Sequence, residues 1–290
     1  MENLRGILLM TLAMVGFAVT DALLKALTGQ LPIAQVIMML GTGGFAIFAV
    51  AVIASGQPLL TRDALRPVVI MRNLAEGTAT ASFVTALSLI PLSTASAILQ
   101  ANPLFVTMGA ALFLGEAVGW RRWLAIGTGF CGMLMILRPI TQGLDWGASL
   151  AVLAMLMLTV RDVSTKVMPK SLSTLQIAAY AFVSVFLTGV LMLPFGPSPV
   201  VPNGLQMALM LSAIVVGPLA YYAITASMRI GEMSAITPFR YTRLVFAMGI
   251  AILVLGERPD SYTLLGAAII IASGLYTFAR ERKRRSAEKL

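Results

Sequence analysis

The sequence has 290 residues, of which 58% are apolar and only 11% are charged, and its formal net charge is +9. Soluble domains carry roughly 25% charged residues, so this composition excludes an ordinary soluble fold and indicates a protein embedded in a membrane. There is no histidine and a single cysteine, Cys131, which removes the commonest general base and any cysteine-rich metal site. We therefore expect no catalytic centre, no metal and no cofactor.

Ten apolar stretches follow one another along the chain, separated by charged or Pro/Gly-rich segments. Each is near the roughly 20 residues that a membrane-spanning helix requires. Because several of the separating segments are short, neighbouring helices must run antiparallel. We predict an all-α polytopic membrane protein with ten transmembrane helices, at residues 4–27, 33–54, 67–90, 93–114, 122–138, 146–168, 174–193, 204–228, 233–255 and 261–279.

The lysines and arginines fall mostly on one side of this arrangement. The side that holds both termini carries fourteen of them against three on the other side, and the ratio is still 8 to 3 without the C-terminal tail. Positively charged loops stay in the cytoplasm, so we expect a bacterial inner-membrane protein with both termini cytoplasmic. This asymmetry and a basic tail near lipid headgroups explain the net charge. The expected partner is therefore membrane lipid and not nucleic acid.

Two motifs recur at one offset of 141 residues. The offset relates two Asp/Lys pairs and two Leu-Gly-Glu motifs, namely Asp21/Lys25 with Asp162/Lys166 and residues 114–116 with 255–257. Two matches at equivalent places indicate two copies of one unit, residues 1–140 and 141–290. Each copy holds five predicted helices, an odd number, so the second copy must enter the membrane in the opposite orientation. Inverted repeats of this kind build many secondary transporters.

The Asp/Lys pairs lie toward opposite ends of the predicted bundle. Asp21 and Lys25 come near the outer end of the first helix, and Asp162 and Lys166 come near the inner end of the sixth. Such pairs can close the two mouths of an alternating transporter in turn, because ionic contacts made in one state are exchanged for water in the other. The alternative is a lysine that snorkels from a helix end beside an i,i+4 partner.

The stretch "NPLFVTMGAALFLGE", followed by "WLAIGTGFCGMLMI", resembles the repeat unit of the drug/metabolite transporter superfamily in its EamA-type branch. In that unit a proline, here Pro103, precedes a Leu-Gly-Glu turn, and a helix that bears a glycine, here Gly127, ends the repeat. In the second copy Leu244 stands where the proline is expected and Pro238 comes six residues earlier, so we expect the ninth helix to bend at another level. The resemblance implies transport of a small solute.

Four arginines lie at membrane depth: Arg72, Arg161, Arg240 and Arg243. An ionisable group inside a span costs about 2.5–3.5 kcal/mol on insertion scales, so each normally faces a cavity or a partner. Arg72 and Glu76 are four residues apart and can neutralise each other, although burial would also suit Glu76 to carry a proton. Arg161 adjoins Asp162 and is interpreted as a charge of the inner gate or of an interface. We assign Arg72 and Glu76, together with the two Asp/Lys pairs, to gating or coupling.

Arg240 and Arg243 lie close to the predicted midplane, three residues apart, with Tyr241 between them. At the offset of 141 they correspond to a segment of the fourth helix that contains Gln100 and Asn102. The two copies therefore meet at mid-membrane with polar groups from both. This is where a transporter built from inverted repeats binds its substrate, so we predict that these five residues form the substrate site.

Two guanidiniums in a low-dielectric site require a counter-charge. An acid on another helix can supply it, Glu76 being nearest by depth, or it can come from an anionic group on the substrate. Arginine's planar fork suits a carboxylate held through two hydrogen bonds. We therefore predict a small organic metabolite that bears a carboxylate and resembles an amino acid.

We predict that the protein exports this metabolite by alternating access, as the resemblance favours, and acts as a monomer or a homodimer. The superfamily also includes importers of S-adenosylmethionine and riboflavin, so uptake of such a solute is the alternative within transport. A membrane-embedded enzyme or lipid-handling protein is the alternative from another class. The absence of histidine argues against such an enzyme.

Overall fold

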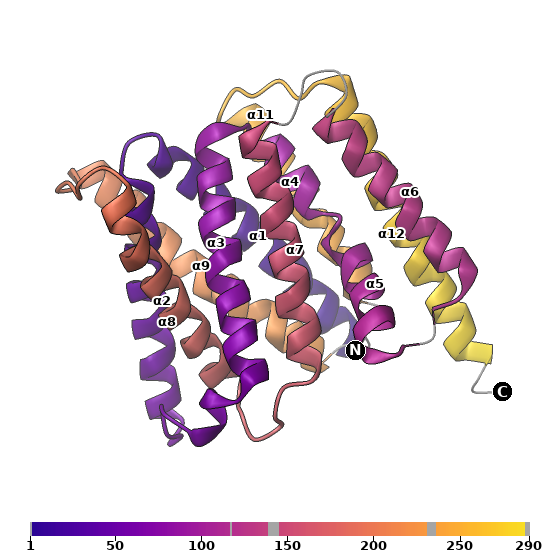
Figure 1. Ribbon diagram of the computed structural model, residues 1–290, viewed down its shortest axis with the longest axis horizontal. Helices are drawn as coiled ribbons and strands as arrows, with labels where there is room; N and C mark the ends of the chain where they lie inside the picture. The colour runs from indigo at the N-terminus through magenta and orange to yellow at the C-terminus, as the bar shows by residue number, and fades with distance from the viewer. Residues whose placement is uncertain (1, 117, 139–144, 231–235, 288–290) are drawn as a thin grey trace.

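The computed structural model describes residues 2–116, 118–138, 145–230 and 236–287, and across these residues it is helical and contains no β-strand (Figure 1). Three short 3₁₀ helices, η1 (Arg62–Leu65), η2 (Leu193–Phe195) and η3 (Thr237–Tyr241), accompany the α-helices. The α-helices are α1 (Glu2–Thr28), α2 (Ile33–Ala54), α3 (Pro67–Leu89), α4 (Leu92–Leu99), α5 (Asn102–Leu114), α6 (Trp120–Leu137), α7 (Trp146–Lys166), α8 (Thr174–Met192), α9 (Gly204–Ile230), α11 (Thr242–Leu253) and α12 (Ser261–Ala287).

Seven segments of the described chain are long and apolar enough to cross a membrane, which confirms a multi-pass membrane protein. They comprise α1, α2, the joined α4 and α5, α7, α8, α9 and α12. The other three predicted spans correspond to α3, which carries Arg72 and Glu76, to α6, which begins with Trp120 and two arginines, and to α11, which has only 12 residues. The count of ten spans therefore remains a prediction.

Two segments near the middle of the bundle are interrupted. The fourth predicted span is divided into α4 and α5 at Gln100 and Ala101, with Pro103 in the first turn of α5. In the described part of the ninth predicted span, η3, with Pro238 in its first turn, is followed by α11. The change from η3 to α11 falls at Tyr241 and Thr242, which correspond to Gln100 and Ala101 at the offset of 141. The junction therefore lies at the same level as the break in the fourth span, and the bend at another level that the position of Pro238 led us to expect is not found there.

The two Leu-Gly-Glu motifs end their helices in the same way. Gly115 and Gly256 both have φ +68°, the left-handed conformation that glycine adopts at least cost. The amide of Glu116 then donates to the Ala110 carbonyl at 3.2 Å, and the amide of Glu257 donates to the Ala251 carbonyl at 2.9 Å. Each of these positions in the first motif maps onto the second at the offset of 141.

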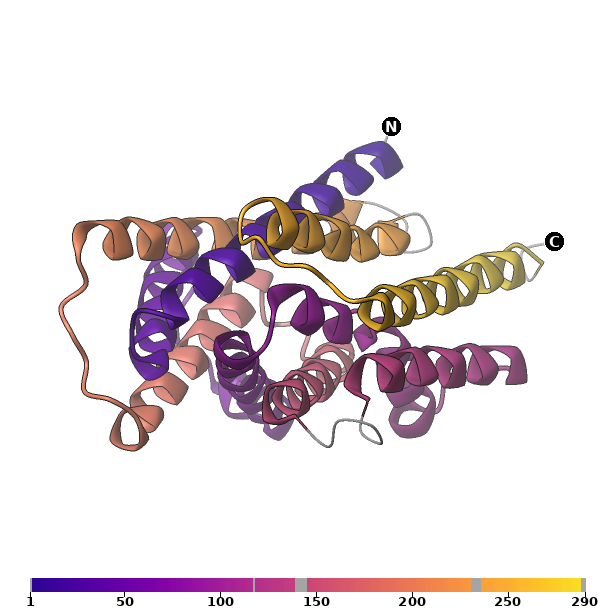
Figure 2. The same ribbon diagram turned by 90° about the horizontal axis from the view of Figure 1, so that it is seen from above.

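The most extensive helix contacts among the described residues keep their pattern when the helices before residue 140 are exchanged with those after it, whereas the smaller α1–α3 contact has no comparable α7–α9 counterpart. The exchange turns the α1–α9 contact into the α3–α7 contact and the α1–α11 contact into those of α4 and α5 with α7. Three contacts, α2–α8, α4–α11 and α6–α12, map onto themselves. In Figure 1 the α2 and α8 pair and the α6 and α12 pair stand at opposite sides of the bundle, and Figure 2 shows α6 and α12 side by side.

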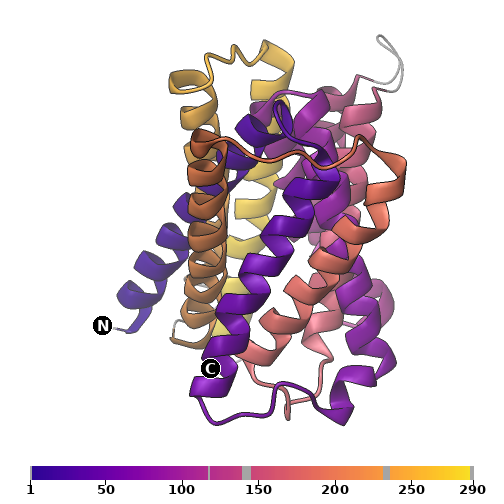
Figure 3. The ribbon, with the colours of Figure 1, turned by 90° about the vertical axis from the view of Figure 1, so that its left-hand side faces the viewer.

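The α2–α8 crossing depends on two glycines. A Cβ atom added to Gly41 would lie 2.3 Å from the backbone nitrogen of Phe186, and one added to Gly189 would lie 2.5 Å from that of Met38. Figure 3 views this side of the molecule, with α2 between α8 and α9. Small residues at a crossing let two backbones approach closely, which is a main source of helix association in lipid.

We predict that Gly41→Ala will lower the stability of the detergent-solubilised protein by about 1–3 kcal/mol, the usual cost of overpacking, because the obstructing atoms belong to the α8 backbone. The matched control is Gly127→Ala in α6, where an added Cβ meets nothing within 4 Å. Thermal unfolding of the two purified variants measures the difference. Equal melting temperatures would show that the α2–α8 crossing does not require a glycine.

Candidate functional site

A cavity of about 220 Å³ lies among α1, α3, the α4–α5 break, α7, α8, α9 and the η3–α11 segment. Its walls are mainly apolar, and aromatic side chains contribute much of them. Five charged side chains face the same space. The aromatic residues are Phe17, Phe83, Phe182 and Tyr221, and the charged residues are Asp21, Glu76, Arg161, Arg240 and Arg243.

Arg243 forms an ion pair with Asp21 across this cavity. Its Nη2 and Nε donate to Oδ2 of Asp21 at 2.7 Å and 3.1 Å. The guanidinium also lies 5.3 Å from the ring centroid of Phe17, within the range of a cation–π contact. Only 7% of the Asp21 side chain and 20% of the Arg243 side chain are exposed. The pair therefore joins α1 to α11 in a largely buried setting.

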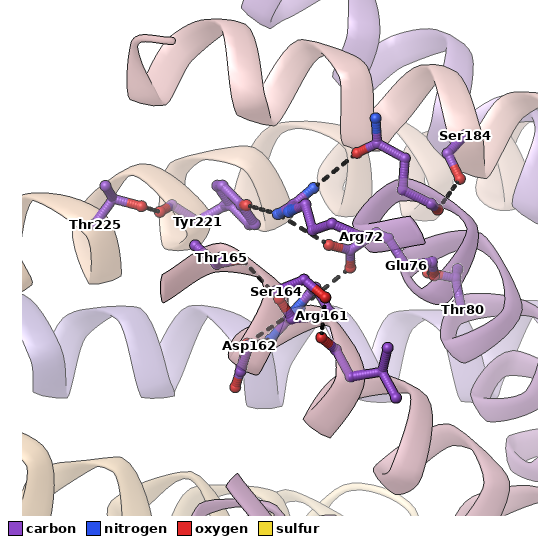
Figure 4. A network of polar contacts seen from close by, with 12 residues as sticks. Arg72, Glu76, Thr80, Arg161, Asp162, Ser164, Thr165, Ser184, Tyr221 and Thr225 are labelled. Atoms are coloured by element: carbon purple, nitrogen blue, oxygen red, sulfur yellow. Dashed lines mark hydrogen bonds and ion pairs between the residues drawn. The ribbon is translucent and has the colours of Figure 1, made fainter. Parts of the chain in front are cut away.

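A chain of alternating charges continues from α3 through α7 to η3. Figure 4 shows its members on α3 and α7. Arg72 lies 3.3 Å from Glu76, whose other oxygen lies 3.1 Å from Arg161. Arg161 in turn contacts Asp162 at 2.8 Å, and Asp162 lies 3.5 Å from Arg240. Glu76 and Asp162 thus each sit between two arginines, and Arg240 terminates the chain.

Arg72 is the most deeply buried of these arginines, with 2% of its side chain exposed. Besides Glu76, it donates to the Tyr221 hydroxyl at 2.5 Å and to Asn73 at 3.2 Å (Figure 4). Tyr221 lines the cavity, so Arg72 reaches the site through that side chain. Arg72 therefore positions its neighbours and is not itself among the residues that line the cavity.

The charges of this network do not cancel. Four arginines, Arg72, Arg161, Arg240 and Arg243, meet three carboxylates, Asp21, Glu76 and Asp162. With all three carboxylates ionised, the described residues around the cavity carry one surplus positive charge. The surplus belongs to the α3–α7–η3 chain, because Asp21 and Arg243 neutralise each other. Arg240 has the longest ion-pair contact of the four arginines, which leaves its guanidinium best placed for an anion from outside the protein.

The break between α4 and α5 contributes two amides to the cavity. The Gln100 side chain donates to the backbone carbonyl of Tyr241 at 3.2 Å, so it satisfies a carbonyl in η3. The Asn102 amide satisfies both of its ends when its nitrogen donates to Asp162 and its oxygen accepts from the Thr159 amide, each at 3.2 Å. Irregular backbone at membrane depth is tolerated where it lines a cavity, as it does here.

Four of the five residues predicted for substrate binding line the cavity, namely Arg240, Arg243, Gln100 and Asn102. Tyr241 does not line it, since its ring packs edge-on against Phe278 with centroids 6.5 Å apart and its hydroxyl fills the space over Gly274 on α12. The acid that contacts Arg243 is Asp21, whereas Glu76, the candidate from predicted depth, contacts Arg72 and Arg161.

The predicted i,i+4 pairs take different partners in the structure. Asp21 pairs with Arg243, and Lys25 donates to two backbone carbonyls near the end of α3. Asp162 pairs with Arg161 and Arg240, and Lys166 contacts Glu116 at 3.1 Å. The aspartates therefore belong to the charge network around the cavity, and the lysines belong to the two ends of the bundle.

Sequence reasoning overlooked several lining residues. Phe17, Phe83 and Phe182 give no signal in a chain where apolar side chains are everywhere. Arg161 was interpreted as a gate or interface charge, yet it lines the cavity. Glu257, the last residue of the second Leu-Gly-Glu motif, was interpreted as fixing its own turn. Its carboxylate also accepts hydrogen bonds from the first amides of α4, at 2.7 Å and 3.0 Å.

Comparison with known proteins gives one family. The EamA-like transporter family model matches residues 4–138 and again residues 145–279. The chain is 32% identical to a riboflavin transporter of Rhizobium johnstonii over 70% of this chain and 67% of that one. It is 30% identical to an S-adenosylmethionine uptake transporter of Rickettsia felis over 76% and 75%. A pseudopaline exporter of Pseudomonas aeruginosa is 25% identical over 92% and 94%.

A solved crystal structure has the same fold. It superposes with a TM-score of 0.64 at 19% sequence identity and covers 97% of this chain and 98% of its own. At that identity the likeness concerns the fold alone.

We predict that Arg243→Ala will lower the stability of the purified protein by about 3 kcal/mol, because it leaves the Asp21 carboxylate buried without its cation. Adding Asp21→Asn should restore part of the loss, since the double variant contains no unpaired charge at this place. Adding Glu76→Gln is the control and should not restore it, because Glu76 pairs with other arginines. Thermal unfolding in detergent measures all three. A better rescue by Glu76→Gln than by Asp21→Asn would contradict the assignment.

Proposed function

The chain belongs to the EamA-like transporter family, and from that membership we propose that it exports a small amino-acid-like metabolite by alternating access. Its relatives are named as transporters of small molecules, and this chain is accordingly a small-molecule transporter and not an enzyme.

The proposed topology is ten spans in two inverted five-helix repeats, residues 1–140 and 141–290. Three observations support it. The family model matches the chain twice, at residues 4–138 and 145–279. The Leu-Gly-Glu motifs form identical left-handed caps at an offset of 141 residues. The most extensive helix contacts also keep their pattern when the two halves are exchanged. A cavity at the interface of such repeats is the usual place for the substrate.

The proposed location is the bacterial inner membrane with both termini in the cytoplasm. α1 begins and α12 ends toward the lower edge of the bundle in Figure 1, and the loop between α2 and α3 lies at that edge too. This is the side on which the sequence places most of its lysines and arginines. Positive loops are retained in the cytoplasm, so the loops at the opposite edge face outward.

The proposed substrate bears a carboxylate, and the observation that carries this is the surplus guanidinium at the cavity. A buried cationic site without enough protein acids is stabilised by an anion from the solute. Arg240 lies at the end of its charge chain and Arg243 lies on the same cavity, so both can direct N–H groups at one carboxylate. The cavity volume of about 220 Å³ is below the 300–1,000 Å³ typical for drug-sized ligands, which favours a small metabolite.

Asp21 gives the site a place for an ammonium group. Both hydrogen bonds from Arg243 end on Oδ2 of Asp21, which leaves Oδ1 for a donor on the solute. A zwitterion that binds Arg240 through its carboxylate and Asp21 through its ammonium meets an opposite charge of the protein at each of its own charged groups. This arrangement supports an α-amino acid group as the part of the solute that is recognised. The aromatic wall of Phe83, Phe182 and Tyr221 then suits an apolar or ring-bearing remainder.

Uptake of S-adenosylmethionine is the second candidate. The Rickettsia felis relative is named for that uptake, and S-adenosylmethionine carries an α-amino acid group together with an aromatic base. Export is supported by the pseudopaline exporter, which matches 92% of this chain. The two candidates predict the same charged contacts and opposite directions.

We predict that vesicles containing the purified protein will exchange labelled amino acids, or S-adenosylmethionine, for unlabelled solute. Arg240→Ala should weaken binding of that solute about tenfold or more, as for the loss of a hydrogen bond to a charged group. Arg243→Lys should also impair it, because an ammonium cannot reproduce the fork that spans Asp21 and the solute. The readouts are vesicle exchange and a ligand-induced thermal shift, each normalised to folded protein.

The matched control is Arg62→Ala, which removes an exposed arginine from η1. A carboxamide analogue of the solute tests the anion directly and should bind poorly to the parent protein. Unchanged exchange and affinity in both Arg240→Ala and Arg243→Ala would refute the site. Exchange of riboflavin alone would refute the amino-acid-like substrate and leave transport intact.

We predict that a cysteine at Ser198, in the α8–α9 loop, will react with an impermeant thiol reagent added to intact cells. A cysteine at Ser55, at the end of α2, should be protected until the cells are opened, because its loop faces the cytoplasm. Both positions are exposed, and the exposed Cys131 is first replaced by alanine. Labelling of Ser55→Cys from outside would reverse the proposed orientation.

A further inference from the structure

The turn between α3 and α4 is held by two charges from distant parts of the chain. Lys25 on α1 donates to the Leu87 carbonyl at 2.6 Å and to the Ile90 carbonyl at 2.8 Å. Glu257, after α11, accepts from the Leu92 amide at 2.7 Å and from the Ser93 amide at 3.0 Å. The lysine thus satisfies carbonyls at the C-terminus of α3, and the glutamate satisfies amides at the N-terminus of α4.

These contacts replace caps that the turn itself does not provide. Pro91 precedes α4 and offers no side-chain acceptor, so the first amides of α4 depend on Glu257. The Ser93 hydroxyl adds a third hydrogen bond to the same carboxylate at 2.7 Å. Leu92 and Ser93 are at most 1% exposed, so water cannot take over this role while the turn stays packed. We call Lys25, Glu257 and the α3–α4 turn the outer clamp.

The counterparts of the two charges behave differently at the other end of the bundle. At the offset of 141, Lys25 corresponds to Lys166 and Glu257 corresponds to Glu116. There the lysine and the glutamate contact each other at 3.1 Å, and 43% and 52% of their side chains are exposed. An exposed pair of this kind contributes little stability and separates easily. Lys25 and Glu257 therefore bind the ends of α3 and α4, whereas Lys166 and Glu116 bind only each other among the contacts described.

We propose that Lys25 and Glu257 close the outer mouth of the cavity, and that Lys166 and Glu116 perform the same closure at the cytoplasmic end in the opposite state of the cycle. The outer clamp joins α1 and the end of α11 to α3 and α4, and all four elements contribute to the cavity wall or its charges. Opening that end requires the four elements to part, and the released charges can then pair with each other as Lys166 and Glu116 do here.

This inference rests on the proposed transport by alternating access but not on the substrate. It gives the Leu-Gly-Glu motif a second task. The glycine ends the helix in the left-handed conformation, and the glutamate beyond it acts as a positioning residue that holds one end of the cavity shut. A residue that only stabilised the fold would affect both faces of the cavity alike. A gate shifts accessibility from one face to the other.

The test is the reactivity of a cysteine at Thr80, which lines the cavity on α3, in a Cys131→Ala background. An impermeant thiol reagent is applied to right-side-out and to inside-out vesicles without any solute. Lys25→Met or Glu257→Gln should raise labelling from the outer face and lower it from the cytoplasmic face. The change should reach roughly tenfold, as for the loss of hydrogen bonds to a charged group. Ser93→Ala, a milder change that removes one of the three bonds, should shift labelling in the same direction by less.

Lys166→Met and Glu116→Gln should not raise labelling from the outer face and should raise it from the cytoplasmic face. The control is Lys170→Met, which removes an exposed lysine at that same end and should change neither. All rates are normalised to folded protein by gel filtration. Equal changes on both faces, or the same direction for outer and inner variants, would overturn the gate. If the parent protein still exchanged solute, the gate proposal would be wrong while the transport proposal would stand.

Discussion

A guanidinium inside a membrane must meet an opposite charge, and this constraint determines which helices of this protein meet around the cavity. Hydrocarbon side chains gain little by leaving lipid for one another, so apolar packing alone specifies such a bundle weakly. The four arginines supply the specificity. Arg243 joins α11 to α1 through Asp21, and the chain from Arg72 to Arg240 joins α3, α7 and η3. The same contacts enclose the cavity, so the charges that hold the central helices also form the site.

From the sequence it was possible to tell which charged residues need an ion-pair partner, but not which residue would be that partner. The positions of most helices follow from the apolar runs, and Pro103 and Pro238 marked the two interrupted segments. The partner of Arg243 did not follow, because the rotation of α1 about its axis decides where Asp21 points. The i,i+4 spacing suggested that Lys25 would be the partner of Asp21. A lysine near a helix end can also reach backbone carbonyls, and here Lys25 reaches those of α3.

The lining of the cavity shows a second limit. A phenylalanine in a membrane helix looks the same in sequence whether it faces lipid, another helix or a cavity, so Phe17, Phe83 and Phe182 were not separable from the rest. Tyr241 shows the converse, since it lies between two lining arginines but turns toward α12. Gly274 on α12 leaves the space that the Tyr241 ring occupies. The sequence around Tyr241 gives no sign that a glycine on another helix lies beside it.

The cavity is less symmetric than the helices that build it. Asp21 and Asp162 occupy equivalent positions, but at the offset of 141 Arg243 corresponds to Asn102 and Arg240 to Leu99. Asp21 therefore meets a full cation, whereas Asp162 meets a neutral amide and relies on Arg161 and Arg240. The positive groups that suit an anion come from the second half of the chain alone. A solute bound there has its anionic end fixed relative to one half, so the two end states of a cycle present it with different charges. The two proposed gates are thus equivalent at the offset of 141, whereas the candidate site between them is not.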